Sequence, residues 1–161
     1  MREMVMSGKD LSRVTVKDMV KNREVFYSVS LDDTVKEAAS TLKRLHIRAT
    51  GVLEGKKLVG VFSHYDVSTK VVTEGKDPNA TKVKDVMTPD VIKVNLHNTF
   101  SECLEIFGQH NISHLVVEDK DGNYYGVVSQ KDMQDKMLEN LKNMLEITQQ
   151  YAFGPYPSGK D

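Results

Sequence analysis

The sequence lacks the features of secreted, membrane-spanning and broadly nucleic-acid-binding proteins. Its single cysteine, Cys103, cannot form an internal disulfide, so a reducing compartment is expected and the cytoplasm is the predicted location. No stretch approaches the roughly 18 uncharged apolar residues of a membrane span, and residues 1–10 carry charges where a signal peptide needs an apolar core. The 22 basic and 23 acidic residues nearly cancel, so no overall positive field attracts a phosphate backbone. Neither a membrane anchor nor a general nucleic-acid surface is expected.

The overall composition is typical of globular proteins. Of the 161 residues, 39% are hydrophobic and 28% are charged. A compact chain of this length buries roughly 70% of its unfolded surface, so a core can form without disulfides or a metal. Length alone allows either one ordinary domain or two small ones.

The first half of the sequence recurs in the second half. VKDMV returns as VKDVM, VSLDDTVKEA as VNLHNTFSEC, and GVFSHYDV as GVVSQKDM. These pairs begin at Val16 and Val83, Val29 and Val94, and Gly60 and Gly126. All three offsets are about 66 residues, and the order is the same in both halves, which indicates an internal structural repeat.

Each half contains the same predicted order of elements, β-α-β-β-α. Runs rich in β-branched and aromatic residues predict strands at 24–29, 48–53 and 57–62 in the first half, and at 91–94, 114–118 and 124–128 in the second. The T-x-x-E sequences at Thr34 and Thr99 are capping boxes that begin the central helices. A second helix begins at Ser63 or Ser129. Alternating strands and helices predict an α/β (α+β) fold.

The repeat divides the chain into five expected parts. These are an N-terminal extension (1–14), the first repeat (15–73), a surface linker (74–81), the second repeat (82–140) and a C-terminal helix extension with a tail (141–161). A unit of about 60 residues is too small to bury both of its faces alone, so the two repeats are expected to form one module.

Both repeats place the pattern S-x-x-D where an apolar strand meets a helix. The pairs are Ser63 with Asp66 and Ser129 with Asp132. The serine and the free N–H groups of the first helical turn can bind an anion, and the aspartate can accept hydrogen bonds from a ribose diol. This arrangement suits a nucleotide. The alternative is that S-x-x-D only caps the helix, as most isolated examples do.

Two copies of this unit, each ending in G-h-h-S-x-x-D, resemble a tandem pair of CBS domains, also called a Bateman module. The resemblance covers about residues 15–140 and includes the sequence VKDVMTP at 83–89. It implies two repeats packed about a pseudo-twofold axis, with two clefts that bind AMP, ADP, ATP or S-adenosylmethionine as an effector. It also implies a regulatory protein without catalytic activity or an obligatory cofactor, which signals through the geometry of a homodimer or an unidentified regulated partner.

The resemblance assigns phosphate contacts to the serine and ribose contacts to the aspartate, and it completes each cleft from both repeats. Arg48 and His114 occupy positions where relatives place a basic phosphate contact. The cleft of Ser63 and Asp66 is expected to include Thr88, Pro89, Asp90, Val91, Ile112, Ser113 and His114. The cleft of Ser129 and Asp132 is expected to include Lys21, Asn22, Arg23, Val25, Ile47 and Arg48. Because the first repeat has MVKN at 19–22 where the second has VMTP, the two clefts need not be equivalent.

The repeat argues against two other chemistries, a metal site and a catalytic cysteine. His110 and His114 are four residues apart, a spacing that binds metals on a helix, but the repeat ends the helix near His110 and places His114 on a strand. No metal site is therefore predicted. Cys103 lies on the apolar stripe of a helix, which favours a buried small side chain over a catalytic nucleophile.

The last helix, expected over about 130–150, is longer than its counterpart in the first repeat. Its apolar residues recur every three or four positions over about 30 Å: Met133, Met137, Leu138, Leu141, Met144, Leu145 and Tyr151. We expect this stripe to form a homodimer, the alternative being that it packs on residues 1–11. A structural or adaptor module with empty clefts, acting through this helix, is the second hypothesis for function. The segment 153–157 is expected to be irregular.

Overall fold

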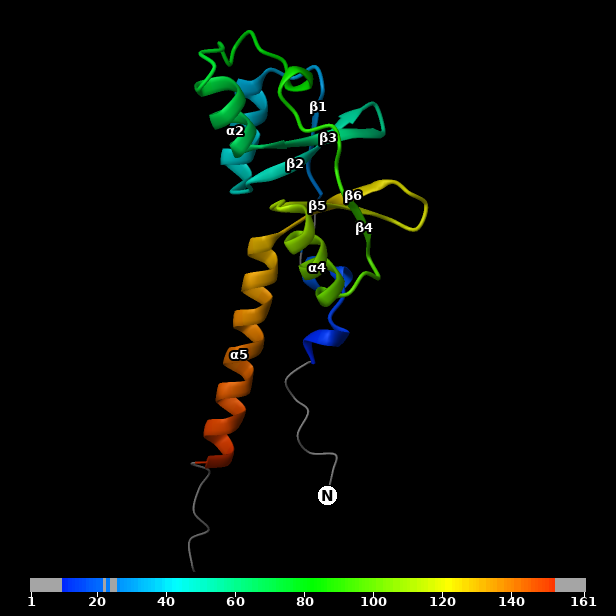
Figure 1. Cartoon of the computed structure of the whole chain (residues 1–161), viewed down its shortest axis with the longest axis vertical. Coiled ribbons are helices and arrows are strands. Elements are labelled where there is room, and N and C mark those ends of the chain that lie inside the picture. Colours follow the sequence, from blue (N-terminus) through cyan, green and yellow to red (C-terminus); the bar gives the residue numbers. More distant parts are fainter. Residues whose placement is uncertain (1–9, 22, 24–25, 153–161) are drawn as a thin grey trace, which may run out of the picture.

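A computed structural model describes residues 10–21, 23 and 26–152 (Figure 1). The elements of the first half are η1 (Leu11–Arg13), α1 (Val16–Val20), β1 (Ser28–Ser30), α2 (Val35–Leu45), β2 (Ala49–Glu54), β3 (Lys57–Ser63), α3 (His64–Asp66) and the π-helix η2 (Val67–Val72). Those of the second half are η3 (Val83–Asp85), β4 (Lys93–Asn95), α4 (Phe100–His110), β5 (His114–Glu118), β6 (Tyr124–Ser129) and α5 (Gln130–Ala152).

The two central helices begin and end in the same way. Thr34 caps α2 and Thr99 caps α4, each through the predicted capping box with a glutamate three residues later. Each helix ends on a residue in the left-handed conformation, His46 with φ 54° and Asn111 with φ 49°. The internal repeat therefore extends to the backbone conformation at the helix ends.

The two sheets have the same topology. Their strand orders are β1-β2-β3 and β4-β5-β6, and in each sheet the first pair is parallel and the second antiparallel. Each antiparallel pair also carries an irregularity at the matching place, between Val52 and Leu53 and between Val117 and Glu118. These features confirm the predicted α/β fold of two β-α-β-β-α repeats.

The first strand of each sheet begins later than the sequence predicted. The first sheet starts at Ser28 rather than at residue 24, because the Tyr27 carbonyl accepts hydrogen bonds from the side chains of Thr50 (2.6 Å) and Tyr124 (2.9 Å). The second sheet starts at Lys93 rather than at residue 91. Residues 91 and 92 belong instead to the segment that connects Thr88, which forms an isolated bridge with β3, to strand β4. Residues 24 and 25 lie outside the described residues.

The helix predicted to begin at Ser63 changes type after one turn. The short α3 continues as η2, in which the wider π-helical turn places Lys70 against the carbonyl of Val86 (2.9 Å). The residues that follow, expected to be a surface linker, cover the start of α2. The carbonyls of Pro78 and Thr81 accept the N–H groups of Lys36 and Val35.

The segment that leads into each repeat packs against the other repeat. Val14, Val16 and Val20 belong to the core of the second repeat, and the Val14 carbonyl accepts the N–H of Phe100 at the start of α4. Val83 and Val86 belong to the core of the first repeat. The two halves are therefore linked by exchanged segments, and a smaller cluster of Ala49, Val61 and Val116 joins the sheets.

The C-terminal helix α5 extends well beyond the rest of the molecule (Figure 1). Its apolar stripe is exposed at Met137, Leu138, Leu141, Met144, Leu145 and Tyr151. Residues 1–9 and 153–161, which include most of the segment considered for packing on this helix and the predicted irregular tail, lie outside the described residues. No helix in the described part of the chain is sufficiently long and apolar to cross a membrane.

Candidate functional site

Two cavities open at the junction of the repeats. The Ser63 cleft, of about 720 Å³, is lined by eight of the residues assigned to it and to its motif: Ser63, Asp66, Thr88, Asp90, Val91, Ile112, Ser113 and His114. The Ser129 cleft, of about 740 Å³, is lined by Ser129, Asp132, Arg23, Ile47 and Arg48 from the predicted set. The structure thus brings together residues far apart in sequence in the two groups that the sequence predicted.

Four predicted residues do not line these cavities or are not described. Pro89 is exposed and is absent from the lining of both clefts, although its neighbours Thr88 and Asp90 contribute. Lys21 is also absent from both linings, because it is the exposed residue that ends α1. Asn22 and Val25 lie outside the described residues.

In the Ser63 cleft the motif aspartate is fully occupied by partners in the chain. One carboxylate oxygen of Asp66 accepts the backbone N–H and the hydroxyl of Ser63, both at 2.8 Å. The other accepts from Lys70 Nζ at 2.7 Å and from the Thr88 hydroxyl at 3.2 Å. The Asp66 side chain is only 3% exposed. A ligand that uses this carboxylate must displace Lys70 or Thr88.

The loop after η3 closes this cleft by pairing with β3. Thr88 and Val61 exchange two backbone hydrogen bonds of 2.9 Å. The close approach requires the glycine that begins the repeated motif, because a Cβ on Gly60 would lie 2.7 Å from the Thr88 carbonyl oxygen. A residue from the second repeat is thereby held beside Asp66 of the first.

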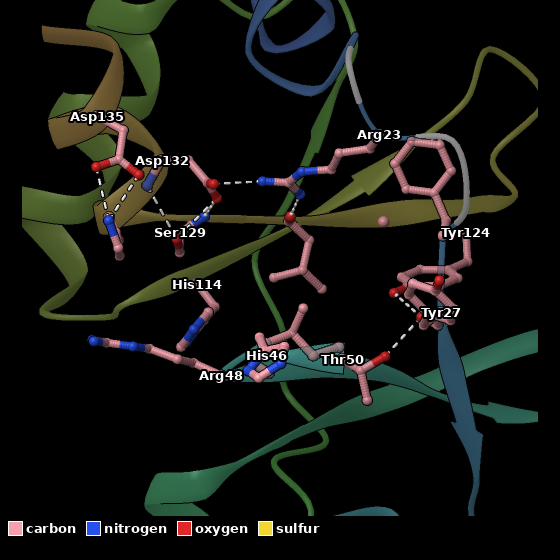
Figure 2. A pocket seen from close by; sticks show the side chains of 16 residues that line it. Arg23, Tyr27, His46, Arg48, Thr50, His114, Tyr124, Ser129, Asp132 and Asp135 are labelled. Carbon is pink, nitrogen blue, oxygen red and sulfur yellow. Dashed lines mark hydrogen bonds and ion pairs between the residues drawn. The ribbon is translucent and has the colours of Figure 1, made fainter. Parts of the chain in front are cut away.

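In the Ser129 cleft the motif aspartate pairs with an arginine from the other repeat (Figure 2). The backbone N–H and the hydroxyl of Ser129 donate to one oxygen of Asp132, at 2.6 and 2.8 Å. Arg23 Nη2 lies 2.5 Å from the other oxygen, and the same guanidinium donates to the carbonyl of Val127. Asp132 is more accessible than Asp66, with 26% of its side chain exposed.

Both S-x-x-D motifs are therefore capping arrangements, the alternative that the sequence left open. Each uses one carboxylate oxygen for the cap and pairs the other with a cation, Lys70 or Arg23. A second role remains compatible with this geometry, because the paired oxygen faces a cleft and its cation can be exchanged for another donor.

One wall of the Ser129 cleft is aromatic, with Phe26, Tyr27 and Tyr124 in its lining. The Tyr124 hydroxyl accepts the N–H of Gly51 (3.0 Å) and donates to the Tyr27 carbonyl (2.9 Å), so this ring from the second repeat is fixed on the first. Burial raises the pKa of Tyr124, which keeps the hydroxyl protonated as a donor. A planar ring of a ligand could pack against such a wall.

Sequence reasoning missed these aromatic residues and Lys70. Phe26 and Tyr124 carry no motif, and their meeting depends on how the repeats pack. Lys70, four residues after Asp66, had the spacing of a helical ion pair and could have been found. A second signal was the repeated motif glycine, since a Cβ on Gly126 would lie 2.4 Å from Phe26.

The two clefts share a basic wall. Arg48 and His114 line both cavities (Figure 2 shows them from the Ser129 cleft). The pKa of His114 is lowered from its usual value of 6.5, mainly by burial and by His64, while Asp132 and Asp66 oppose this shift.

The chemistry of other candidate residues is unfavourable. Cys103 is completely buried, and burial raises the pKa of its thiol to about 11, so the nucleophilic thiolate is suppressed. His110 ends α4 and His114 begins β5, as the repeat predicted. Within the described part of the chain, no three histidine, cysteine, aspartate or glutamate side chains gather as a metal site requires.

The fold and the clefts define a tandem-repeat module with approximate twofold symmetry, in which residues of both halves complete each cavity. The chain belongs to the CBS-domain family. The model of the CBS domain matches residues 14–73 and again residues 83–139.

Two curated relatives illustrate the range of proteins that contain this module. The chain is 27% identical over 126 residues to the CBS domain-containing protein YhcV of Bacillus subtilis, which covers 78% of this chain and 87% of YhcV. It is 29% identical over 130 residues to an inosine-5'-monophosphate dehydrogenase of Methanocaldococcus jannaschii, covering 80% of this chain but 24% of the enzyme. The chain thus spans about a quarter of that enzyme.

Solved structures show the same fold. The CBS domain protein NE2398 has a TM-score of 0.72 and 30% identity, covering 77% of this chain and 97% of its own. The CBS domain pair of MJ0100, solved with 5'-methylthioadenosine and S-adenosyl-L-methionine, has a TM-score of 0.69 and 22% identity, covering 77% and 99%. CBSX2, solved with AMP, has a TM-score of 0.63 and 22% identity, covering 78% and 97%.

Proposed function

We propose that this protein is a regulatory CBS pair that binds an adenosine ligand, AMP, ADP, ATP or S-adenosylmethionine, in the clefts between its repeats. The observation that carries the proposal is the convergence, in each cleft, of a motif aspartate and the shared basic wall of Arg48 and His114. Proteins of the same fold have been solved with AMP and with S-adenosyl-L-methionine, which supports this ligand class.

Different residues of the Ser129 cleft bind different parts of the ligand. Asp132 accepts hydrogen bonds from the ribose hydroxyls, Arg48 and His114 face the phosphate, and the aromatic wall receives the base. Asp132 now pairs with Arg23, so a bound ribose either exchanges with that guanidinium or shares the carboxylate with it. Ligand binding therefore acts directly on a contact between the two repeats.

This contact provides a route for a signal. Arg23 follows α1, whose valines pack in the core of the second repeat together with Met133 of α5. A shift of Arg23 on ligand binding is thus transmitted to the base of the long helix. We propose that α5 forms the seam of a homodimer, or the contact with a regulated protein, and that the change in its geometry reports occupancy of the clefts.

The proposed role is regulatory rather than catalytic. The one cysteine is buried with a raised pKa, and the motif carboxylates are occupied by cations and caps rather than poised for proton transfer. The protein is proposed to act in the cytoplasm without an obligatory cofactor.

A structural or adaptor role is the second candidate. The observation in its favour is that both motifs are satisfied as helix caps, which would leave the clefts without a ligand and α5 as the functional surface. This role predicts that truncation after Asn140 abolishes dimerisation or partner binding while nucleotides have no effect.

A thermal-shift panel separates the two candidates. Purified protein, stripped of ligand, is heated with AMP, ADP, ATP, S-adenosylmethionine or no addition. A ligand at 100 times its Kd is expected to stabilise the native state by about 2.7 kcal/mol. Asp132→Ala is expected to weaken the shift, whereas the control variant Glu105→Ala, at an exposed position of α4 outside both clefts, should retain it. No shift with any ligand at millimolar concentration favours the adaptor role.

A further inference from the structure

Arg48 and His114 connect the two clefts. Each residue lines both cavities, together with Ser129 and Lys131. Arg48 directly precedes β2 of the first repeat, and His114 begins β5 of the second. The basic wall therefore belongs to neither cleft alone. An anion bound beside it in one cavity changes the electrostatic potential in the other.

Most other cations around the clefts are already committed. Arg23 is paired with Asp132, and Lys131 Nζ lies 2.8 Å from both carboxylate oxygens of Asp135. The Arg48 side chain is exposed and makes no hydrogen bond or ion pair with another described residue, although the Arg48 carbonyl accepts the N–H of His64. Among the described residues that line the clefts, Arg48 thus offers a guanidinium without an ion-pair partner to neutralise a ligand, and it lines both cavities.

We propose that the two clefts share a single phosphate subsite, formed by Arg48 and His114, so that ligands with a di- or triphosphate chain bind with negative coupling. This inference rests on the proposed function and adds that binding in one cleft affects binding in the other. Uncharged adenosine binds to each cleft independently of the other. The first polyphosphate to bind, in contrast, pairs with the shared guanidinium of Arg48, which is then not available to the second.

The coupling has a simple electrostatic origin. A second polyphosphate meets the charge of the first without a free cation between them, in a partly enclosed space where screening by solvent is weaker. Coupling between two binding sites commonly changes affinity by 5-fold to 150-fold. The ratio of the second to the first Kd is therefore expected to be at least about tenfold larger for ATP than for adenosine.

Equilibrium dialysis of the full chain with radiolabelled adenosine and ATP tests this. Arg48→Gln should raise the first Kd for ATP and bring its Kd ratio to that of adenosine, because neither cleft then has the guanidinium. Arg48→Lys, which keeps the charge, should retain a large ratio. Arg44→Gln, on an exposed position of α2, is the matched control and should behave as wild type.

The outcomes separate this inference from the function on which it depends. If neither ligand binds, the proposed function fails and the shared subsite with it. If adenosine and ATP bind with similar Kd ratios, or if Arg48→Gln leaves the ATP ratio unchanged, the shared subsite is wrong while adenosine binding stands. The shared subsite is supported if the Kd ratio for ATP exceeds that for adenosine in the wild type and in Arg48→Lys but not in Arg48→Gln.

Discussion

Arg23 of the first repeat and Asp132 of the second form an ion pair across the Ser129 cleft, with Nη2 and Oδ1 2.5 Å apart. The matching position in the other cleft uses different chemistry. There, Asp66 is held by Lys70 of its own repeat and by the hydroxyl of Thr88 from the other. The two clefts are thus built on the same plan but differ in charge and burial at the carboxylate, and the following predictions use that difference.

The two motif aspartates should contribute unequally to stability. Asp66→Ala removes a buried carboxylate and leaves Lys70 and the Ser63 hydroxyl without their acceptor, so we expect a loss of about 3 kcal/mol in the free energy of unfolding. Asp132→Ala removes a more exposed cap and should cost about 1 kcal/mol. Urea unfolding measures both. Equal losses would contradict the assignment of Asp66 as the more structural residue.

The motif glycine should be essential where the leading segment crosses β3. In Gly60→Ala the added Cβ approaches the Thr88 carbonyl and the Met87 sulfur to within 3 Å, so the variant should lose about 1–3 kcal/mol. Gly108→Ala is the matched control, since a Cβ there meets no atom within 4 Å and the residue lies inside α4. It should gain about 0.5–1 kcal/mol. A neutral Gly60→Ala would contradict the described approach of Thr88.

These results show what the sequence could and could not predict. The repeat, the capping boxes of Thr34 and Thr99 and the two S-x-x-D pairs followed from local patterns, whereas the other members of each cleft followed from the resemblance to the CBS family. The sequence also predicted that each cleft includes residues of both halves, through its resemblance to the CBS family. It did not reveal the exchange of the segments leading into the repeats. Local spacing carries no information on which core Val16 or Val83 enters, because both cores offer similar apolar surfaces.

The position of strand β1 illustrates the same limit. The run at 24–29 has strand-like composition, yet the Tyr27 carbonyl is taken by two side chains, one of them Tyr124 from the other repeat. A hydrogen bond across 97 residues overrides a local propensity. Phe26 and Tyr27 therefore line the Ser129 cleft rather than extend the sheet.

Phosphate binding should depend on pH through His114. Burial, His64 and Arg48 lower the pKa of this imidazole in the free protein, while Asp132 and Asp66 oppose them. A bound phosphate favours the imidazolium, so the complex binds more protons than the free protein and affinity rises as pH falls. In the free protein the pKa of His114 lies below 6.5, and in the complex it is higher. The affinity is therefore expected to rise as the pH falls through the interval between these two pKa values.

The affinity for AMP is measured for the wild type and for His114→Gln between about pH 5.5 and 8, the range in which histidine titrates. The readout is the ratio of the two affinities at each pH. The ratio removes the titration of the phosphate itself, and His64→Gln tests whether the neighbouring histidine is responsible instead. Adenosine, which has no phosphate, should show no comparable change. A ratio that is independent of pH would mean that His114 does not contact the phosphate.

The exposed stripe of α5 should hold two copies together. Leu141 is 49% and Leu145 63% exposed in the single chain, and both lie on the part of the helix that extends past the repeats. The double variant Leu141→Glu/Leu145→Glu should be monomeric by sedimentation velocity, with its clefts and nucleotide binding retained. Lys142→Glu, on the polar side of the same helix, should remain dimeric. A wild-type monomer, or a dimer that survives the double substitution, would exclude α5 as the seam.

The most direct test of adenosine binding between the repeats is calorimetric titration of AMP into the stripped full chain. The account predicts saturable binding that is strongly weakened in Asp132→Ala and Arg48→Gln and unchanged in the control variants Glu105→Ala and Arg44→Gln, which lie outside both clefts. Absence of binding at millimolar AMP, ATP and S-adenosylmethionine, or binding that survives both cleft substitutions, would contradict it.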